Sequence, residues 1–203
     1  MLAIIEAAGW PIWLLIAASV GAVTIIVYRL LWVRESQVAP KDLLARTVAE
    51  YRRGGATPDL IQRLSQGPLL GRVFAAGLKH VGSPREVMKE SIEDAGREVA
   101  RELDQFLTTL GSIASMSPLL GLFGTVVGMI EIFGSQTGGG SSPAMLAHGI
   151  SVALYNTAYG LIVAIPSMIF YRHFRAKADA LLLEMELQAI KLVEIIYGER
   201  RGE

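Results

Sequence analysis

The distribution of positive charge constrains this chain more than any other feature of its sequence. All 19 Lys and Arg residues lie in two blocks, 29–101 and 172–201. Residues 1–28 and 102–171 contain none, and 52% of the whole chain is hydrophobic. A soluble domain is usually less apolar than this. The pattern therefore indicates long uncharged segments that avoid water.

The first apolar stretch runs from Gly9 to about Val33 and has aromatic residues at both ends. Its uncharged part, residues 7–28, is long enough to cross a hydrocarbon core of about 30 Å. Aromatic side chains such as Trp10 and Tyr28 favour the two membrane–water interfaces. A signal peptide would carry positive charge before its apolar core, whereas here the positive charge follows it. We therefore predict a retained transmembrane helix whose N-terminus lies outside the cytoplasm.

Two further apolar stretches are joined by a short uncharged loop rich in Gly and Ser. Because Lys and Arg are enriched on the cytoplasmic side of membrane proteins, both charged blocks are placed in the cytoplasm. The predicted segments are the periplasmic N-terminus with the first span (1–33), a cytoplasmic helical region (34–105), the second span (106–133), a periplasmic loop (134–143), the third span (144–171) and a cytoplasmic helical tail (172–203).

Helix-start signals mark the cytoplasmic region. Thr57 and Ser83 each precede a proline, which suits the first position of a helix. Glu86 lies three residues after Ser83, a spacing that predicts a capping box. One continuous helix is predicted over residues 84–133, and the third span continues into an amphipathic tail over residues 174–197. The predicted fold class is all-α: a three-span helical membrane protein with long helices extending into a cytoplasmic helical bundle.

Small residues recur at steps of three and four along the second and third spans, so each set shares one helical face. The set in the second span is Gly111, Ala114, Pro118, Gly121, Thr125 and Gly128. The set in the third span is Gly149, Ala153, Thr157, Gly160, Ala164 and Ser167. Small residues let helices approach closely in lipid, so helix packing is the simplest role of the glycines, Gly124 included, and of the alanines.

Few polar groups lie within the predicted spans. The hydroxyls of Thr125 and Thr157 bond either to their own helices or to water in a pore, so these two residues are candidate pore-lining groups. Ser115, Asn156 and Glu131 are accessory candidates for the pore. An interhelical hydrogen bond is the favoured role of Asn156, whereas Glu131 suits either function or interfacial water near the outer end of its span. No titratable group lies at mid-membrane, so a conducting complex would need one from a partner.

The composition argues against several functional classes. The chain has no cysteine, which excludes disulfides, thiolate metal sites and cysteine nucleophiles. Its three histidines lack metal-ligand spacing, so neither a metal site nor a cofactor is predicted. The net charge of zero gives no basic footprint for nucleic acid. No nucleophile–base pair or phosphate-binding loop is present, so an enzyme is not predicted.

Two stretches resemble the MotA/TolQ/ExbB proton channel family, and its ExbB/TolQ-type subunits in particular. Residues 117–129, SPLLGLFGTVVGM, resemble the second-span signature of these subunits. Residues 149–166, with the elements GISVAL, TA, GL and AIP, resemble their third span. The resemblance covers roughly residues 84–190. One position departs from the pattern, because Val152 stands where the family typically has glutamate, which points to a divergent member as much as to the iron-uptake or cell-division subunit.

The resemblance implies a multi-pass protein of the bacterial inner membrane that forms a homo-oligomer, a pentamer, in the lipid bilayer. The pentamer would surround a smaller ExbD/TolR-type single-span protein whose membrane aspartate carries the proton past Thr125 and Thr157. Proton flow would energise an envelope process through a TonB/TolA-type protein. The competing interpretations are a non-conducting structural scaffold and, less favoured, a small solute transporter, since neither an internal repeat nor a midplane charge is seen.

Overall fold

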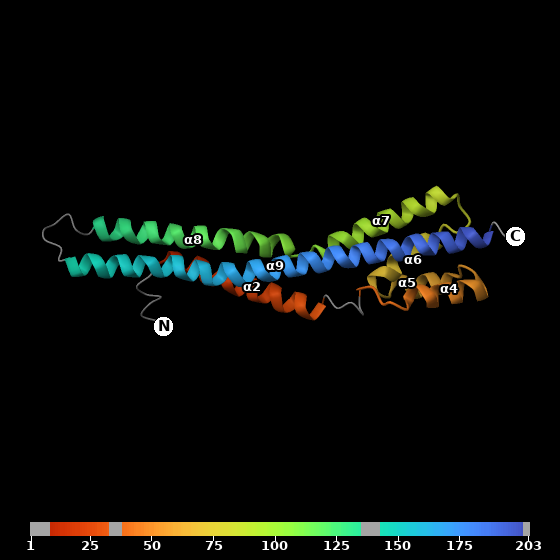
Figure 1. The fold of residues 1–203 in the computed structure, drawn as a ribbon, viewed down its shortest axis with the longest axis horizontal. Coiled ribbons are helices and arrows are strands. Elements are labelled where there is room, and N and C mark those ends of the chain that lie inside the picture. Colours follow the sequence, from red (N-terminus) through yellow and green to blue (C-terminus); the bar gives the residue numbers. More distant parts are fainter. Residues whose placement is uncertain (1–8, 33–37, 135–142, 201–203) are drawn as a thin grey trace. The chain divides into compact units, whose positions relative to one another are not determined.

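A computed structural model describes residues 9–32, 38–134 and 143–200 of the chain. All regular secondary structure of these residues is helical (Figure 1). The helices are α2 (Pro11–Trp32), α4 (Leu43–Gly54), α5 (Pro58–Ser65), α6 (Leu69–Leu78), α7 (Arg85–Leu103), α8 (Leu107–Gly134) and α9 (Pro143–Arg200). Three helical stretches, which include α2, α8 and α9, are long and apolar enough to cross a membrane. The predicted all-α fold class is confirmed.

Two of the predicted segments lie partly outside the described residues. The glycine-rich loop predicted over residues 134–143 is described only at its two ends, Gly134 and Pro143. The predicted periplasmic N-terminus, residues 1–8, is also outside the described part of the chain. The boundaries of the six predicted segments therefore stay predictions.

The chain divides into two compact units. The first, here called the apolar unit, comprises residues 1–28 and 106–174, and the second, the charged unit, comprises residues 29–105 and 175–203. The helix α9 has 58 residues and belongs to both units, since it runs unbroken from Pro143 to Arg200. Its continuity agrees with the predicted extension of the third span into an amphipathic tail.

Within the apolar unit, α2 lies antiparallel to α8. The ring of Trp10 meets that of Phe123 edge-on, with centroids 5.9 Å apart, and Tyr28 meets Phe106 at 5.7 Å. All three long helices of this unit expose large apolar side chains, among them Trp13, Val20, Leu119, Val126, Ile130, Leu154, Ile162, Ile165 and Ile169. These exposed apolar surfaces suit the hydrocarbon core of a membrane. A helix is stable there because its backbone N–H and C=O groups bond to one another.

The charged unit has an apolar core formed by its short helices and the end of α9. Leu70 and Phe74 on α6, Met88 on α7 and Leu192 on α9 are fully buried. The guanidinium of Arg72 lies 2.5 Å from a carboxylate oxygen of Glu102, which adds an ion pair between α6 and α7. The amphipathic pattern of the charged block therefore forms a helical bundle, as the sequence predicted.

The predicted capping box at the start of α7 is wrong. The helix begins at Arg85, with Pro84 before it and no side-chain cap hydrogen bond. The amide of Ser83 donates to the carbonyl of His80 at 2.9 Å, so it is not available to Glu86. The carbonyl of Ser83 accepts a hydrogen bond of 2.7 Å from the hydroxyl of Tyr197, near the end of α9. The backbone amide that a capping box would use is thus already bonded within the preceding turn.

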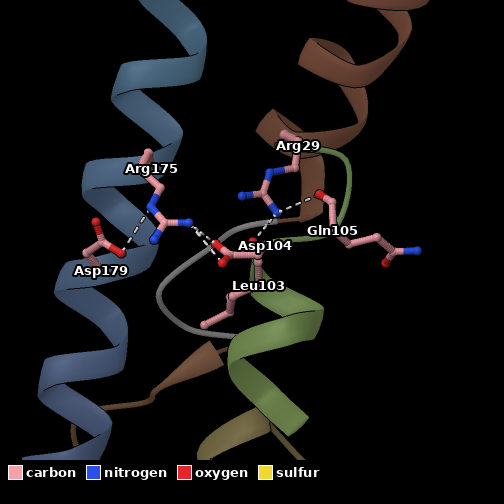
Figure 2. Close-up of polar contacts among 6 residues, drawn as sticks. All are labelled: Arg29, Leu103, Asp104, Gln105, Arg175 and Asp179. Atoms are coloured by element: carbon pink, nitrogen blue, oxygen red, sulfur yellow. Dashed lines mark hydrogen bonds and ion pairs between the residues drawn. The ribbon is translucent and has the colours of Figure 1, made fainter. Parts of the chain in front are cut away.

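The continuous helix predicted over residues 84–133 is also wrong. α7 ends at Leu103 and α8 begins at Leu107, and Phe106 between them has a φ of 63°. Figure 2 shows the contacts at the break: the guanidinium Nη1 of Arg29 donates to the carbonyl of Leu103 at 2.6 Å and to that of Gln105 at 3.4 Å. A side chain from α2 therefore occupies acceptors that a continuing helix would use.

The predicted start of α5 is present, and it generates a test of local stability. The hydroxyl of Thr57 accepts a hydrogen bond of 3.3 Å from the amide of Leu60, and Pro58 takes the first helical position. Replacing Thr57 by Ala removes this cap and is expected to cost about 1 kcal/mol. Amide hydrogen exchange of α5 in the full-length protein should accelerate by about fivefold. The variant Thr57→Ser keeps the acceptor and should exchange like the wild type; equal exchange in all three proteins would contradict the assignment.

Candidate functional site

The helices α8 and α9 lie side by side in the apolar unit and touch through their backbones (Figure 1). A Cβ atom added at Gly121 would lie 2.7 Å from the carbonyl oxygen of Asn156 and 3.0 Å from the Cα of Thr157. A Cβ added at Gly160 would lie 2.6 Å from the carbonyl oxygen of Ser117. Real Cβ atoms essentially never approach other atoms this closely, so both positions require glycine at the observed separation of the helices.

The two candidate threonines meet in this contact. The Oγ1 atoms of Thr125 and Thr157 are 2.6 Å apart, and either hydroxyl can be the donor. Thr125 Oγ1 also lies 3.1 Å from the carbonyl oxygen of Gly121 and 3.2 Å from that of Ala153. Both threonines are half-buried within the single chain. The pair therefore forms a short hydrogen-bonded chain that links the two helices.

Asn156 lies beside the threonine pair. Its side chain is fully buried and packs on Gly124, where an added Cβ would come within 2.7 Å of the Asn156 Cγ atom. The structure therefore brings together three of the predicted polar residues, Thr125, Thr157 and Asn156, on adjoining turns of two helices.

The remaining predicted packing positions also have close neighbours in the apolar unit. Gly111 lies against the ring of Tyr171, Gly128 against Ala153, and Gly149 against Ile132. Ala153 and Ala164 are both buried.

Ser115 and Glu131 are not placed with the threonine pair. Ser115 is exposed, and its hydroxyl donates to the carbonyl of Gly111 on its own helix at 3.0 Å. Glu131 is exposed near the end of α8. Val152, at the position where the family has glutamate, is half-buried. No carboxylate is thus brought to the threonines by the described residues of α8 and α9.

One polar residue that sequence reasoning missed is Arg29. In the sequence analysis, Arg29 was used only to predict the topology. In the structure its side chain is fully buried and bonds to the end of α7. Its burial could have been predicted from its position inside the apolar stretch, three residues before Trp32. An arginine exposed to lipid at this position would be unfavourable.

The α8–α9 contact offers hydroxyl groups but no charged group. A hydroxyl both donates and accepts hydrogen bonds, so the Thr125–Thr157 pair can extend a hydrogen-bonded chain in either direction. A charge-carrying group would have to come from outside these helices, because residues 107–130 and 149–171 contain no Asp, Glu, Lys, Arg or His. Among the described residues, no cluster of His, Cys, Asp and Glu could hold a metal ion.

The fold and this contact define a three-span helical membrane protein with a paired-threonine contact between two of its spans. Residues 66–187 match the model of the MotA/TolQ/ExbB proton channel family. The chain is 30% identical over 191 residues to the putative biopolymer transport protein ExbB-like 3 of Synechocystis, covering 90% of this chain and 88% of that protein. The chain belongs to the MotA/TolQ/ExbB proton channel family.

Two bacterial relatives share a smaller part of their length with this chain. The Tol-Pal system protein TolQ of Pseudomonas aeruginosa is 35% identical over 144 residues, which is 65% of this chain and 60% of that protein. The biopolymer transport protein exbB1 of Vibrio cholerae is 34% identical over 124 residues, which is 60% of this chain and 54% of that protein. The chain therefore matches little more than half the length of these two relatives.

The contact at Gly121 leads to a test of packing. Gly121→Ala would place a methyl group against the backbone of α9, which cannot move aside as a side chain can, so a loss of about 1–3 kcal/mol is expected. Gly96→Ala on α7 is the matched control, because nothing lies within 4 Å of its added Cβ and Ala favours helices. Thermal unfolding in detergent should show a lower midpoint for Gly121→Ala alone. Equal midpoints in both variants would contradict the close contact.

Proposed function

We propose that this chain is the proton-conducting subunit of a membrane motor driven by the proton motive force. The observation that carries the proposal is the Thr125–Thr157 hydroxyl pair, 2.6 Å apart in the contact between two membrane-length helices. Membership of a proton channel family supports it. The absence of any acid or base from residues 107–130 and 149–171 means that the pair serves as part of a path rather than as the proton carrier.

The proposal requires a partner that supplies a titratable group within the membrane. A proton crossing hydrocarbon needs a group that can bind and release it, and an intramembrane carboxylate is the usual one. We assign this group to an aspartate on a single-span protein of the ExbD/TolR type. A homo-oligomer of the present chain, a pentamer, surrounds that partner's helices and presents one threonine pair per subunit.

The orientation in the membrane follows from the charge distribution. The charged unit contains almost all of the Lys and Arg residues, so it lies in the cytoplasm with the C-terminus, and the N-terminus is periplasmic. The membrane is the bacterial inner membrane. The process that the motor energises takes place at the cell envelope and is outer-membrane transport or envelope maintenance. A TonB/TolA-type protein transmits the force from the motor to that process.

A purely structural scaffold is the second candidate, and one observation favours it. The glycine contacts at Gly121 and Gly160 bring the helices into backbone contact, and the Thr125 hydroxyl is also close to a carbonyl of its own helix. In a scaffold, the threonines would only add an interhelical hydrogen bond. The two functions differ in whether the hydroxyls matter for conduction or only for stability.

Proton flux into liposomes distinguishes the two functions. In a complex with the single-span partner, Thr125→Ala and Thr157→Ala should each lower the flux by about tenfold, since losing a hydrogen-bonding group along the path costs about 1–3 kcal/mol. Thr125→Ser keeps the hydroxyl and should retain most of the flux. Replacing the partner's membrane aspartate by Asn should abolish it.

The matched control is Thr24→Ala on α2. Thr24 is exposed, and its hydroxyl bonds to the carbonyl of Val20 on its own helix at 2.8 Å, so the same substitution is made outside the α8–α9 contact. Its flux should equal that of the wild type. Flux that survives both threonine substitutions and the aspartate substitution would rule out the proposed path, and a verified complex without flux would favour the scaffold.

A further inference from the structure

A groove of about 600 Å³ runs between α7 and the end of α9, within the charged unit. On α7 its lining extends from Arg85 to Ala100, which corresponds to about 22 Å of helix. The lining is mainly apolar, and its apolar members include Val73, Ile92, Leu182, Met185, Ile190 and Val193. An elongated apolar groove is a common binding site for an amphipathic helix. The groove therefore has the form of a docking site for a helix.

α7 and the end of α9 run antiparallel beside this groove. Near one end of α7, the hydroxyl of Tyr197 donates to the carbonyl of Ser83 at 2.7 Å. Near its other end, Nη1 of Arg175 lies 2.9 Å from both carboxylate oxygens of Asp104 (Figure 2). These four residues all belong to the charged unit. The two contacts place position 96 of α7 about level with position 184 of α9, and they fix the alignment of the other positions along the groove.

The same part of α9 also carries an exposed apolar stripe. Leu183, Leu187 and Ile190 follow one another at steps of four and three residues, so they share one helical face. Their exposed fractions are 59%, 52% and 47%. In the topology proposed above, this part of α9 lies in the cytoplasm, where lipid does not cover it. A contiguous apolar surface in water is a mark of a protein contact.

The charges beside the groove and beside the stripe are opposite in sign. Arg85 and Lys89 are exposed at one end of the groove, and Glu194 is exposed on α9 one turn beyond the stripe. Among the described residues, none of these three has an ion-pair partner. Two like charges four residues apart on a helix repel each other, so an added carboxylate would be favourable at this end. The two glutamates of the lining, Glu93 and Glu186, lie further along the groove.

We propose that the groove binds the apolar stripe of a second copy of this chain. Leu183 and Leu187 of the second copy then lie in the groove, and its Glu194 lies beside Arg85 and Lys89. The groove and the stripe are different surfaces of one subunit, so the contact is heterologous and builds a ring when its rotation closes. This inference rests on the homo-oligomer of the proposed function and adds the surface through which neighbouring subunits meet.

The alignment of α7 and α9 supports this occupant. In a ring whose axis runs along these helices, neighbouring copies are rotated and not shifted along the axis. The stripe residues Leu183 and Leu187 of one copy are then about level with positions 92–97 of the next copy's α7, where the lining is apolar at Ile92. Glu194 is about level with Arg85 and Lys89. One arrangement thus matches the apolar groups and the charges together.

Cross-linking between two differently tagged copies tests this contact. The chain has no cysteine, so Gly96→Cys and Leu183→Cys each introduce one thiol. A Cβ added at Gly96 has nothing within 4 Å, so the groove accepts the first substitution. When the two full-length variants are co-expressed with the single-span partner, a short bis-maleimide should join them about fivefold more than either variant to itself, because the contact holds the two thiols together. Arg46→Cys, exposed on α4, replaces Leu183→Cys in the matched control and should give no such product.

Charge reversal tests the polar end of the contact. Glu194→Lys places a third cation beside Arg85 and Lys89 and should lower the yield of the cross-linked product by about threefold, as expected for an exposed charge pair. Lys89→Glu should lower it to a similar degree. Combining the two reversals brings opposite charges together again and should restore the yield.

Several results would overturn the inference. They are cross-linking of Leu183→Cys mainly to itself, an equal yield in the Arg46→Cys control, and a double reversal that does not recover the product. A thiol at position 96 that reacts only with the single-span partner would assign the groove to that protein instead. Native mass spectrometry and proton flux on the same complexes separate this failure from that of the proposed function. A conducting homo-oligomer without the cross-linked product would overturn the interface and leave the proton path intact.

Discussion

The backbone contact between α8 and α9 is the constraint on which the site depends. Lipid provides no hydrophobic force between helices, so their association in a membrane relies on close packing and interhelical hydrogen bonds. Gly121 and Gly160 remove the side chains that would keep the helices apart, and each lies against backbone atoms of the opposite helix. The distance of 2.6 Å between the Thr125 and Thr157 hydroxyls is a consequence, because any larger residue at either glycine would separate them. The hydrogen bond between the two threonines thus depends on two glycines that have no functional group of their own.

The division of the chain into two units follows the distribution of charge. The three unit boundaries lie at residues 28/29, 105/106 and 174/175. Arg29 is the first Lys or Arg of the chain and lies near the end of the first apolar stretch, and Arg175 follows Arg172 at the end of the third. Both arginines also bond to residues 103–105, at the second boundary. Two arginines that lie near the ends of apolar stretches therefore bond to the same short segment of the charged unit.

The sequence predicted the parts of the structure that depend on periodicity. Uncharged length gave the three membrane helices, and steps of three and four residues placed Thr125 and Thr157 on small-residue faces, although only the structure shows that they meet. The errors, at the capping box and at the continuous helix, differ in their physical setting. The amide of Ser83 bonds to the carbonyl of His80, three residues earlier, whereas Arg29 is 74 residues from Leu103, so only the second error involves a hydrogen bond between distant segments. Local rules describe the intrinsic helix propensity of a segment. A hydrogen bond from a distant residue can outweigh that propensity.

Two stretches of the chain that cross the boundary between the units differ in their continuity. α9 is one helix of 58 residues. α8 is separated from α7 by residues that are not helical, and Phe106 among them has a left-handed backbone. The threonine contact holds α8 against α9 inside the apolar unit. Inside the apolar unit, α8 is therefore tied to α9, whereas the end of α7 is tied to Arg29 within the charged unit.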